Sequence, residues 1–284
     1  MITHEHSSGV GGSLSPKSLY VRTRITTEVY AQLAREGIRL TLPPDLWSTT
    51  IDQLLQICLR ENPRTSPKTL QAALERARAT AFDTKYAEYT YHHDSRGKDP
   101  LWQHAAFDAL RRVGWEDVRD PRLLVVGVGN GLEAQGLYGD VRRLTIVDIA
   151  PLSLAMARAR LPHATATQDP AENLTSVHSN SQDFYLALRV FQSALLNPLR
   201  AIHEARRVLT PGGAIVLSIS SAFVDCDGRV VLGHVAPRSC SVDASRPVHH
   251  AHSIQRLLLR CGFSDADVAE TRSDIYVTAR NIER

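Results

Sequence analysis

Apolar residues recur with helical periodicity in three stretches near the beginning of the chain, which predicts three short helices. The first stretch covers residues 27–36, and the second lies between Pro44 and Asn62. Ser66-Pro67 has the sequence of an N-cap followed by a first helical residue, so a third helix is expected to run from there to about Ala79.

The second and third helices have broad apolar faces. Short helices of this kind cannot cover such faces by packing on one another alone. We therefore expect the helical segment to form a lid or a homodimer contact, and not an independent domain. The residues of these faces are Leu46, Leu54, Leu55, Leu59, Leu70, Ala73 and Leu74.

From Pro100 onward the pattern changes to a strict alternation of helices and strands. An amphipathic stretch from Pro100 to Val113 comes first, and apolar strands separated by helical patterns follow it. Such alternation predicts an α/β domain with a parallel sheet and helices on both faces. The expected division is a Gly- and Ser-rich disordered tail over 1–17, the helical segment over 18–98 and the α/β domain over 99–284.

Composition narrows the classes of function. Hydrophobic residues make up 43% and charged residues 22% of the chain, and the net charge is +3, as in ordinary globular proteins. No run of about 18 apolar residues occurs, and the start lacks the pattern of a signal peptide, so we expect a cytoplasmic protein. The arginines are scattered, so nucleic acid is not the expected partner. Cys226, Cys240 and the histidines near them match no common zinc spacing, so no metal is expected.

A glycine-rich turn follows the first strand of the α/β domain. The apolar run that starts at Leu123 leads into Gly127-Val-Gly129-Asn-Gly131 and then into a helix. Glycines allow the backbone to approach a ligand where any Cβ would clash. The dinucleotide fingerprint G-x-G-x-x-G would require glycine at position 132, where Leu132 stands. The turn therefore predicts a nucleotide-like cofactor at the carboxyl end of this strand.

A carboxylate ends the next strand. The run from Arg143 finishes at Asp148, and an ionised carboxylate there offers two acceptor oxygens to the hydroxyls of a ribose. The alternative role is the N-cap of the helix over residues 151–160. We favour ribose binding because the glycine turn lies one strand earlier.

Further segments follow in a consistent order: Asp169 to Leu174, Asp183 to Leu188, the Arg-Val-Leu-Thr-Pro-Gly-Gly run at 207–213, and Leu257 to Phe263 before two strands. With the glycine turn and Asp148, these segments resemble the class I S-adenosylmethionine-dependent methyltransferases, in particular those that act on small molecules. The resemblance extends over about residues 100–280. It implies a Rossmann-like fold, with a seven-stranded, mostly parallel sheet that ends in a β-hairpin.

The same resemblance implies S-adenosylmethionine as the cofactor and assigns residues to it. Gly127, Gly129 and Gly131 would pack against the methionine portion. Asp148 and Ile149 would hold the ribose and adenine, and Asp169 would face the adenine edge. The remaining assignments are Asn130, Pro170 and Leu188 beside the cofactor, and Arg189 and Gln192 beside the methyl acceptor.

One position departs from the family pattern. Members usually carry an acidic residue two positions before the first glycine, where it organises the ammonium end of the cofactor, but Val125 stands here. Glu133 or a residue of the N-terminal segment would have to replace that contact.

Aromatic and imidazole side chains are concentrated between Tyr86 and Asp94. His92 and His93 are candidate bases, because an imidazole titrates near neutral pH. Tyr86 and Tyr91 are expected to pack on the sulfonium through cation–π contacts, and Tyr89 to line the acceptor pocket. The alternative is that these aromatics dock the helical segment on the domain.

The resemblance also places acceptor-binding elements in the insertion over residues 222–250. We expect transfer of a methyl group to an oxygen, nitrogen or carbon nucleophile of a small molecule, such as an amino acid, a peptide-like compound or a secondary metabolite. Two alternatives remain: a scaffold that keeps the fold without catalysis, and an RNA methyltransferase.

Overall fold

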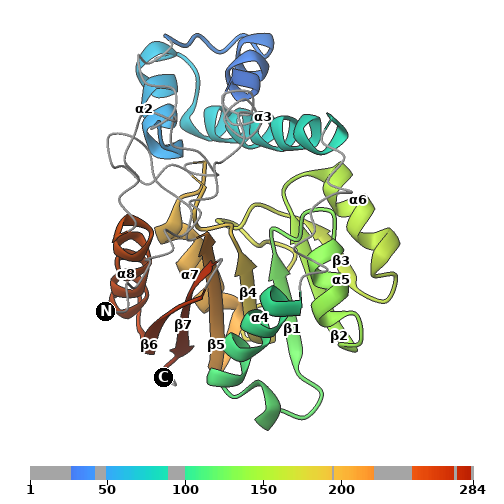
Figure 1. The fold of residues 1–284 in the computed structure, drawn as a ribbon. Helices are drawn as coiled ribbons and strands as arrows, with labels where there is room; N and C mark the ends of the chain where they lie inside the picture. Colours follow the sequence, from blue (N-terminus) through green and yellow to red (C-terminus); the bar gives the residue numbers. More distant parts are fainter. Residues whose placement is uncertain are drawn as a thin grey trace, which may run out of the picture.

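A computed structural model describes residues 27–41, 49–88, 100–193, 195–220, 245–271 and 274–282. Seven strands form one sheet in the order β3-β2-β1-β4-β5-β7-β6 (Figure 1). Strands β1 to β5 are parallel, and β7 is antiparallel to both β5 and β6. The predicted Rossmann-like fold with a terminal hairpin is confirmed. The strands are β1 (Arg122–Val126), β2 (Arg143–Asp148), β3 (Thr165–Gln168), β4 (Gln182–Leu188), β5 (Leu209–Ser220), β6 (Phe263–Glu270) and β7 (Asp274–Asn281).

The helices match the predicted periodicity, with one difference in length. Helix α3 continues nine residues past Ala79 and ends at Glu88. No Gly or Pro interrupts residues 80–88, and Ala81 is buried, so burial carries the helix further than the apolar stripe alone suggested. The helices are residues 27–35, α2 (Ile51–Glu61), α3 (Pro67–Glu88), α4 (Pro100–Arg112), the 3₁₀ turn η3 (Trp115–Asp117), α5 (Leu132–Tyr138), α6 (Pro151–Arg160), α7 (Pro198–Val208) and α8 (Ser245–Arg260).

Helices cover both faces of the sheet. On one face, buried residues of α4, α5 and α6 pack on inward-facing residues of β1, β2, β4 and β5. On the other face, α7 and α8 pack on the alternate residues of the same sheet together with β7. The two apolar clusters hold the strands in place, so the loops at the carboxyl ends of β1 to β4 converge at one edge. Among the helices that the structure describes, none has the length and apolar character that a bilayer span requires.

The N-terminal helices form a third apolar cluster of their own. Leu54, Leu70, Ala73 and Leu74 are all buried in it, and Leu55 and Leu59 pack against it. The α/β domain contributes Leu195 to this cluster. The helices of the segment thus cover these faces together with Leu195, and a role as a lid or homodimer contact stays a prediction. Leu46 lies outside the described residues.

Polar contacts join the helical segment to the carboxyl edge of the sheet, where Figure 1 shows α3 running across one end of the domain. Asp83 of α3 accepts a hydrogen bond of 2.8 Å from the backbone N–H of Leu152, at the start of α6. Arg78 forms a buried ion pair of 3.0 Å with Glu172, which follows β3. The segment thus rests on the loops that follow β2 and β3.

Candidate functional site

The glycine turn connects β1 to α5, and all three of its glycines have left-handed backbones. The φ angles are 68° at Gly127, 59° at Gly129 and 78° at Gly131. A Cβ on Gly127 would lie 2.4 Å from Cγ2 of Val190, and one on Gly131 would lie 2.6 Å from the Cα of Ala157. Backbone conformation and close packing on the protein itself thus require glycine at positions 127 and 131, in addition to any need for ligand space.

Asp148 holds the turn in place from the end of β2. Its Oδ2 accepts a 2.8 Å hydrogen bond from the N–H of Gly129, and its Oδ1 accepts a 2.9 Å bond from the N–H of Ala150. The residue is 6% exposed. Ala150, and not Asp148, is the N-cap residue of α6, so the alternative considered for this carboxylate is not what the structure shows. A buried carboxylate instead lies directly beside the central glycine.

Asn130 lies between the second and third glycines. Its Oδ1 accepts a hydrogen bond of 3.1 Å from the N–H of Leu132, and its backbone carbonyl accepts one of 2.7 Å from Arg160. The Nδ2 atom is buried, and it has no hydrogen-bond partner within the part of the chain that the structure describes. A buried donor without a partner is costly, and it is consistent with a ligand acceptor that completes the turn.

The residues predicted to lie near adenine follow β2 and β3. Asp148 and Gln168 are register partners at the ends of these strands, and Gln168 donates a 3.2 Å hydrogen bond to the carbonyl of Ile149. The carboxylate of Asp169 accepts hydrogen bonds from Thr175 Oγ1 at 2.8 Å and from the N–H of Ser176 at 3.0 Å. It therefore fixes the loop that begins at Pro170, on the side of the turn where Asp148 lies.

The loop after β4 borders the glycine turn on the opposite side. Leu188 ends β4 and is half-buried, and Val190 packs against Gly127. Arg189 has a left-handed backbone with φ of 58°. Its N–H donates to the carbonyl of Ser218 at 2.9 Å. Its guanidinium forms two hydrogen bonds, of 2.6 and 2.8 Å, with the fully buried carboxylate of Asp274.

Asp274 was not identified from the sequence, although an aspartate that opens an apolar strand is a signal for a buried pair. Arg189 was predicted to contact the methyl acceptor, and the structure shows its guanidinium bound to this carboxylate. Gln192 was also predicted to contact the methyl acceptor, and it is buried in the loop after β4.

His250 in α8 is a further candidate at this edge. Its Nε2 lies 3.1 Å from the carbonyl oxygen of Phe191, in the loop after β4. Burial lowers the pKa of this imidazole, and the hydrogen bond to Phe191 offsets only part of that shift. The ring is therefore neutral at neutral pH. Sequence reasoning included His250 within the insertion after β5 but did not single it out.

Several predicted residues cannot be placed. Tyr89, Tyr91, His92 and His93 lie outside the described residues, and so do residues 222–244 of the insertion, with Cys226 and Cys240. Tyr86 belongs to the last turn of α3, where the backbone alone is described.

Comparison with known proteins agrees with this geometry. Residues 124–217 match a family model described as a methyltransferase domain. No curated protein matches the chain. The N-methyltransferase NodS from Bradyrhizobium japonicum WM9, in complex with S-adenosyl-L-homocysteine, has a similar structure, with a TM-score of 0.51 and 17% identity. That similarity covers 72% of this chain and 98% of NodS.

Two other solved structures are similar to the same degree. A possible histamine N-methyltransferase from Thermotoga maritima has a TM-score of 0.50 and 16% identity, over 70% of this chain and 98% of that chain. The [4+2]-cyclase SpnF has a TM-score of 0.51 and 17% identity, over 72% of this chain and 97% of that chain. At these identities the similarity concerns the fold.

Proposed function

We propose that this chain, in which residues 124–217 match a methyltransferase domain, is a class I S-adenosylmethionine-dependent methyltransferase that methylates an oxygen, nitrogen or carbon nucleophile of a small molecule. The observation that carries the proposal is the turn of left-handed glycines with the buried Asp148 beside it. In the sheet, β1 lies between β2 and β4, so the strand order changes direction at β1. Open α/β sheets bind their ligands at the carboxyl ends of the strands at such a point, which is where this turn lies.

The residues present fit the cofactor. The carboxylate of Asp148 is positioned to accept hydrogen bonds from the ribose, since each of its oxygens can accept more than one. The Nδ2 of Asn130, which has no hydrogen-bond partner among the described residues, offers a donor within the turn. Ile149, Asp169 and Pro170 are proposed to border the adenine. Gly127, Gly129, Gly131 and Leu188 are proposed to border the methionine portion, and Tyr86 and Tyr91 to pack near the sulfonium.

The cofactor supplies a methyl group that its sulfonium has already activated. What the chain must add is alignment of the acceptor with the methyl–sulfur bond, exclusion of water and, for an oxygen or carbon acceptor, removal of a proton. The helical segment rests on the loops after β2 and β3 through Asp83 and Arg78, which supports a role as a lid. A lid that excludes water over this edge suits a small acceptor better than a polymer.

His92 and His93 are the proposed bases, and Tyr89, Arg189 and Gln192 are proposed to border the acceptor. Replacing either histidine by alanine is expected to lower turnover by about 100- to 10,000-fold, the usual contribution of a general base. The affinity for S-adenosylhomocysteine should not change. If both variants keep wild-type turnover, the base lies elsewhere or the acceptor is an amine that needs none.

The experiment that tests the function is methyl transfer from labelled S-adenosylmethionine to a fractionated metabolite extract, followed by mass spectrometry. We expect a small molecule that gains one methyl group with wild-type protein, and much less of it with Asp148→Asn when the cofactor concentration is low. The [4+2]-cyclase on the same fold shows why the product must be measured, since fold alone does not decide the reaction. Binding of S-adenosylhomocysteine without any methylated product would support a scaffold, and label in RNA would support the nucleic-acid alternative.

A further inference from the structure

The loop between β3 and β4 covers residues 169–181 and packs along α7. Two of its apolar residues, Leu174 and Val177, are buried in the same cluster as Ala205 of α7. Apolar contacts hold the loop against the helix, but they do not fix the direction of its polar groups, because hydrophobic contacts are not directional. The orientation of Asp169, the first residue of the loop, therefore depends on polar contacts.

An ion pair on α7 supplies contacts of this kind. Glu204 and Arg207 lie three positions apart on the helix, and the guanidinium donates to the carboxylate at 2.9 and 2.7 Å. Burial alone would raise the pKa of Glu204, but hydrogen bonds from Arg207 and from the N–H of Leu174 lower it below its ordinary value. The carboxylate is therefore charged at neutral pH.

The pair binds the backbone in the middle of the loop. Oε2 of Glu204 accepts the N–H of Leu174 at 2.8 Å, and the guanidinium of Arg207 donates to the carbonyl of Leu174 at 2.7 Å. Arg207 also donates to the carbonyl of Val177 at 3.0 Å and to Oγ of Ser179 at 3.2 Å. Hydrogen bonds to charged groups are stronger than neutral ones, so the pair fixes this part of the loop firmly.

The two residues after Leu174 bind Asp169. Oγ1 of Thr175 donates to one oxygen of its carboxylate at 2.8 Å, and the N–H of Ser176 donates to the other at 3.0 Å. Asp169 directly follows Gln168, the register partner of Asp148. Hydrogen bonds and one short stretch of backbone thus connect the ion pair on α7 with a carboxylate at the carboxyl ends of β2 and β3.

We propose that Glu204 and Arg207 are positioning residues for adenine recognition, because they fix the loop so that the carboxylate of Asp169 faces the exocyclic amino group. The proposal rests on the proposed use of S-adenosylmethionine, with Asp169 at the adenine edge. An amino group donates and an ionised carboxylate only accepts, so a carboxylate held in one direction favours adenine over a purine with a carbonyl at that position. The proposal also gives a function to Arg207, which opens the Arg-Val-Leu-Thr-Pro-Gly-Gly run at 207–213.

Attachment of the loop for stability alone is the competing explanation. The two roles differ in whether they affect the choice between ligands. Isothermal titration should compare S-adenosylhomocysteine with S-inosylhomocysteine, in which a carbonyl oxygen replaces the amino group. Wild-type protein is expected to bind S-adenosylhomocysteine more tightly by about 10- to 100-fold, the range for a hydrogen bond to a charged group.

Arg207→Gln removes the charge and the planar fork of donors from the loop. It should lower the preference for S-adenosylhomocysteine by about 3- to 10-fold, about the contribution of one neutral hydrogen bond. The loss should come from weaker binding of S-adenosylhomocysteine. A smaller fraction of folded protein would instead weaken both ligands by the same factor and leave the preference unchanged.

Glu204→Gln keeps the shape of the side chain and should shift the preference in the same direction, so it provides the test if Arg207→Gln does not fold. Arg200→Gln is the matched control, because this arginine is exposed near the start of the same helix. Its preference should stay within about twofold of wild type. An unchanged preference in Glu204→Gln and in folded Arg207→Gln would overturn the proposal, and so would wild-type protein that binds both ligands equally. Wild-type protein that binds neither ligand would overturn the proposed function itself, which is a different outcome.

Discussion

At the scale of single residues, Asp148 combines a structural role that the structure shows with a ligand role that is proposed. Asp148 fixes the N–H groups of Gly129 and Ala150 with the same carboxylate that is proposed to hold the ribose. Loss of this carboxylate therefore affects the shape of the turn as well as the contact with the ligand. Experiments on such residues must separate the two effects.

For Asp148→Asn we expect weaker binding of S-adenosylhomocysteine by about 1.5–3 kcal/mol from the lost charged hydrogen bonds. The amide also turns an N–H group toward one of the two backbone donors, so the turn itself should loosen. Titration with S-adenosylhomocysteine and with its 2′-deoxy analogue separates the two effects. A ribose contact predicts a smaller loss for the 2′-deoxy ligand, whereas identical losses would leave Asp148 with a role in the turn alone.

Gly131→Ala tests whether packing on α6 fixes the third glycine. Gly37 is a matched control, since its φ of 76° is close to the 78° of Gly131 and nothing lies within 4 Å of a Cβ placed there. The left-handed backbone alone should cost each variant about 1–3 kcal/mol of unfolding free energy. Gly131→Ala should lose more, because its Cβ meets the backbone of Ala157 at 2.6 Å. Urea denaturation measures both variants, and equal losses would contradict the packing role.

The sequence predicted the glycine turn and Asp148 because both are local patterns at the ends of apolar strands. The pairing of Arg189 with Asp274 could not be predicted in this way, since the two residues are 85 positions apart. The addition of β7 beside β5 brings them together. The requirement of Gly131 for space next to Ala157 is likewise a property of the packed helices, and no feature of the turn indicated it.

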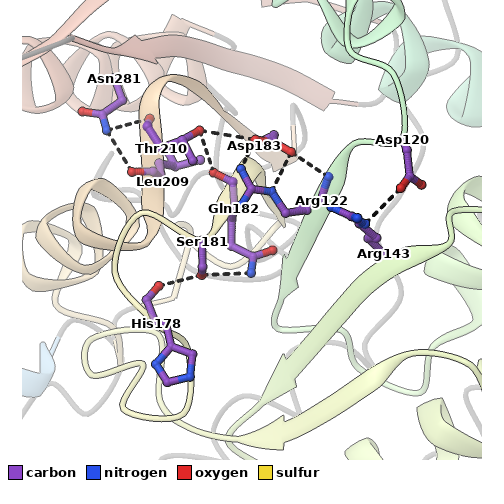
Figure 2. A network of polar contacts seen from close by, with 10 residues as sticks. All are labelled: Asp120, Arg122, Arg143, His178, Ser181, Gln182, Asp183, Leu209, Thr210 and Asn281. Atoms are coloured by element: carbon purple, nitrogen blue, oxygen red, sulfur yellow. Dashed lines mark hydrogen bonds and ion pairs between the residues drawn. The ribbon is translucent and has the colours of Figure 1, made fainter.

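At the scale of elements, the amino ends of β1 and β4 are joined by a polar network opposite the site. Figure 2 shows the guanidinium of Arg122 facing the carboxylate of Asp183, with N–O distances of 3.0 and 2.6 Å. The N–H of Arg122 also donates to Asp183, at 2.9 Å. Burial would raise the pKa of Asp183, but these contacts outweigh it and lower the pKa below its ordinary value of 3.8.

A lowered carboxylate pKa stabilises the folded state above the unfolded-state pKa, and the stabilisation is lost as pH falls through the folded-state pKa. Asp183→Asn should therefore lower the free energy of unfolding by about 1–3 kcal/mol at pH 7. The difference from wild type should shrink below about pH 4, where the carboxyl protonates in the unfolded chain. Urea titrations across this range measure it.

Asp120→Asn is the control at the same end of the sheet, because its pair with Arg143 is exposed (Figure 2). Exposed pairs contribute about 0–1 kcal/mol, so this variant should differ little from wild type at any pH. A pH-independent loss in Asp183→Asn would show that the carboxylate acts through packing and not through its charge.

Element bounds were predictable where capping residues or strand-end residues mark them. The strand Arg143–Asp148 and the helix Pro151–Arg160 agree with the prediction at both ends. The length of α3 was not predictable from its stripe, because its last turns are held by tertiary contacts such as that of Asp83 with Leu152.

At the scale of the whole molecule, the helical segment has its own apolar core, to which the domain adds Leu195, and it also contacts the domain through charged and polar groups. The side chains of Arg78 and Glu172 are 7% and 8% exposed, whereas the contact of Asp52 with Asn197 at the same interface is exposed. The carboxylate of Glu172 also accepts the N–H of Asn197 at 3.0 Å. An interface of this polar kind is more easily opened than an apolar one, which is what a lid requires.

Glu172→Gln should loosen this interface, because it leaves the buried guanidinium of Arg78 without its charged partner. Breaking a buried pair from one side costs about 3–5 kcal/mol. If the segment is a lid, that cost falls on its docking, so limited proteolysis should cut within residues 27–88 faster while the α/β domain stays intact. S-adenosylhomocysteine should slow the cutting of the wild-type segment, since a closed lid and a bound ligand stabilise each other.

Asp52→Asn, which removes an exposed contact, should be cut at close to the wild-type rate. Equal acceleration in both variants, or loss of the whole chain in one step, would show that the segment does not open separately from the domain.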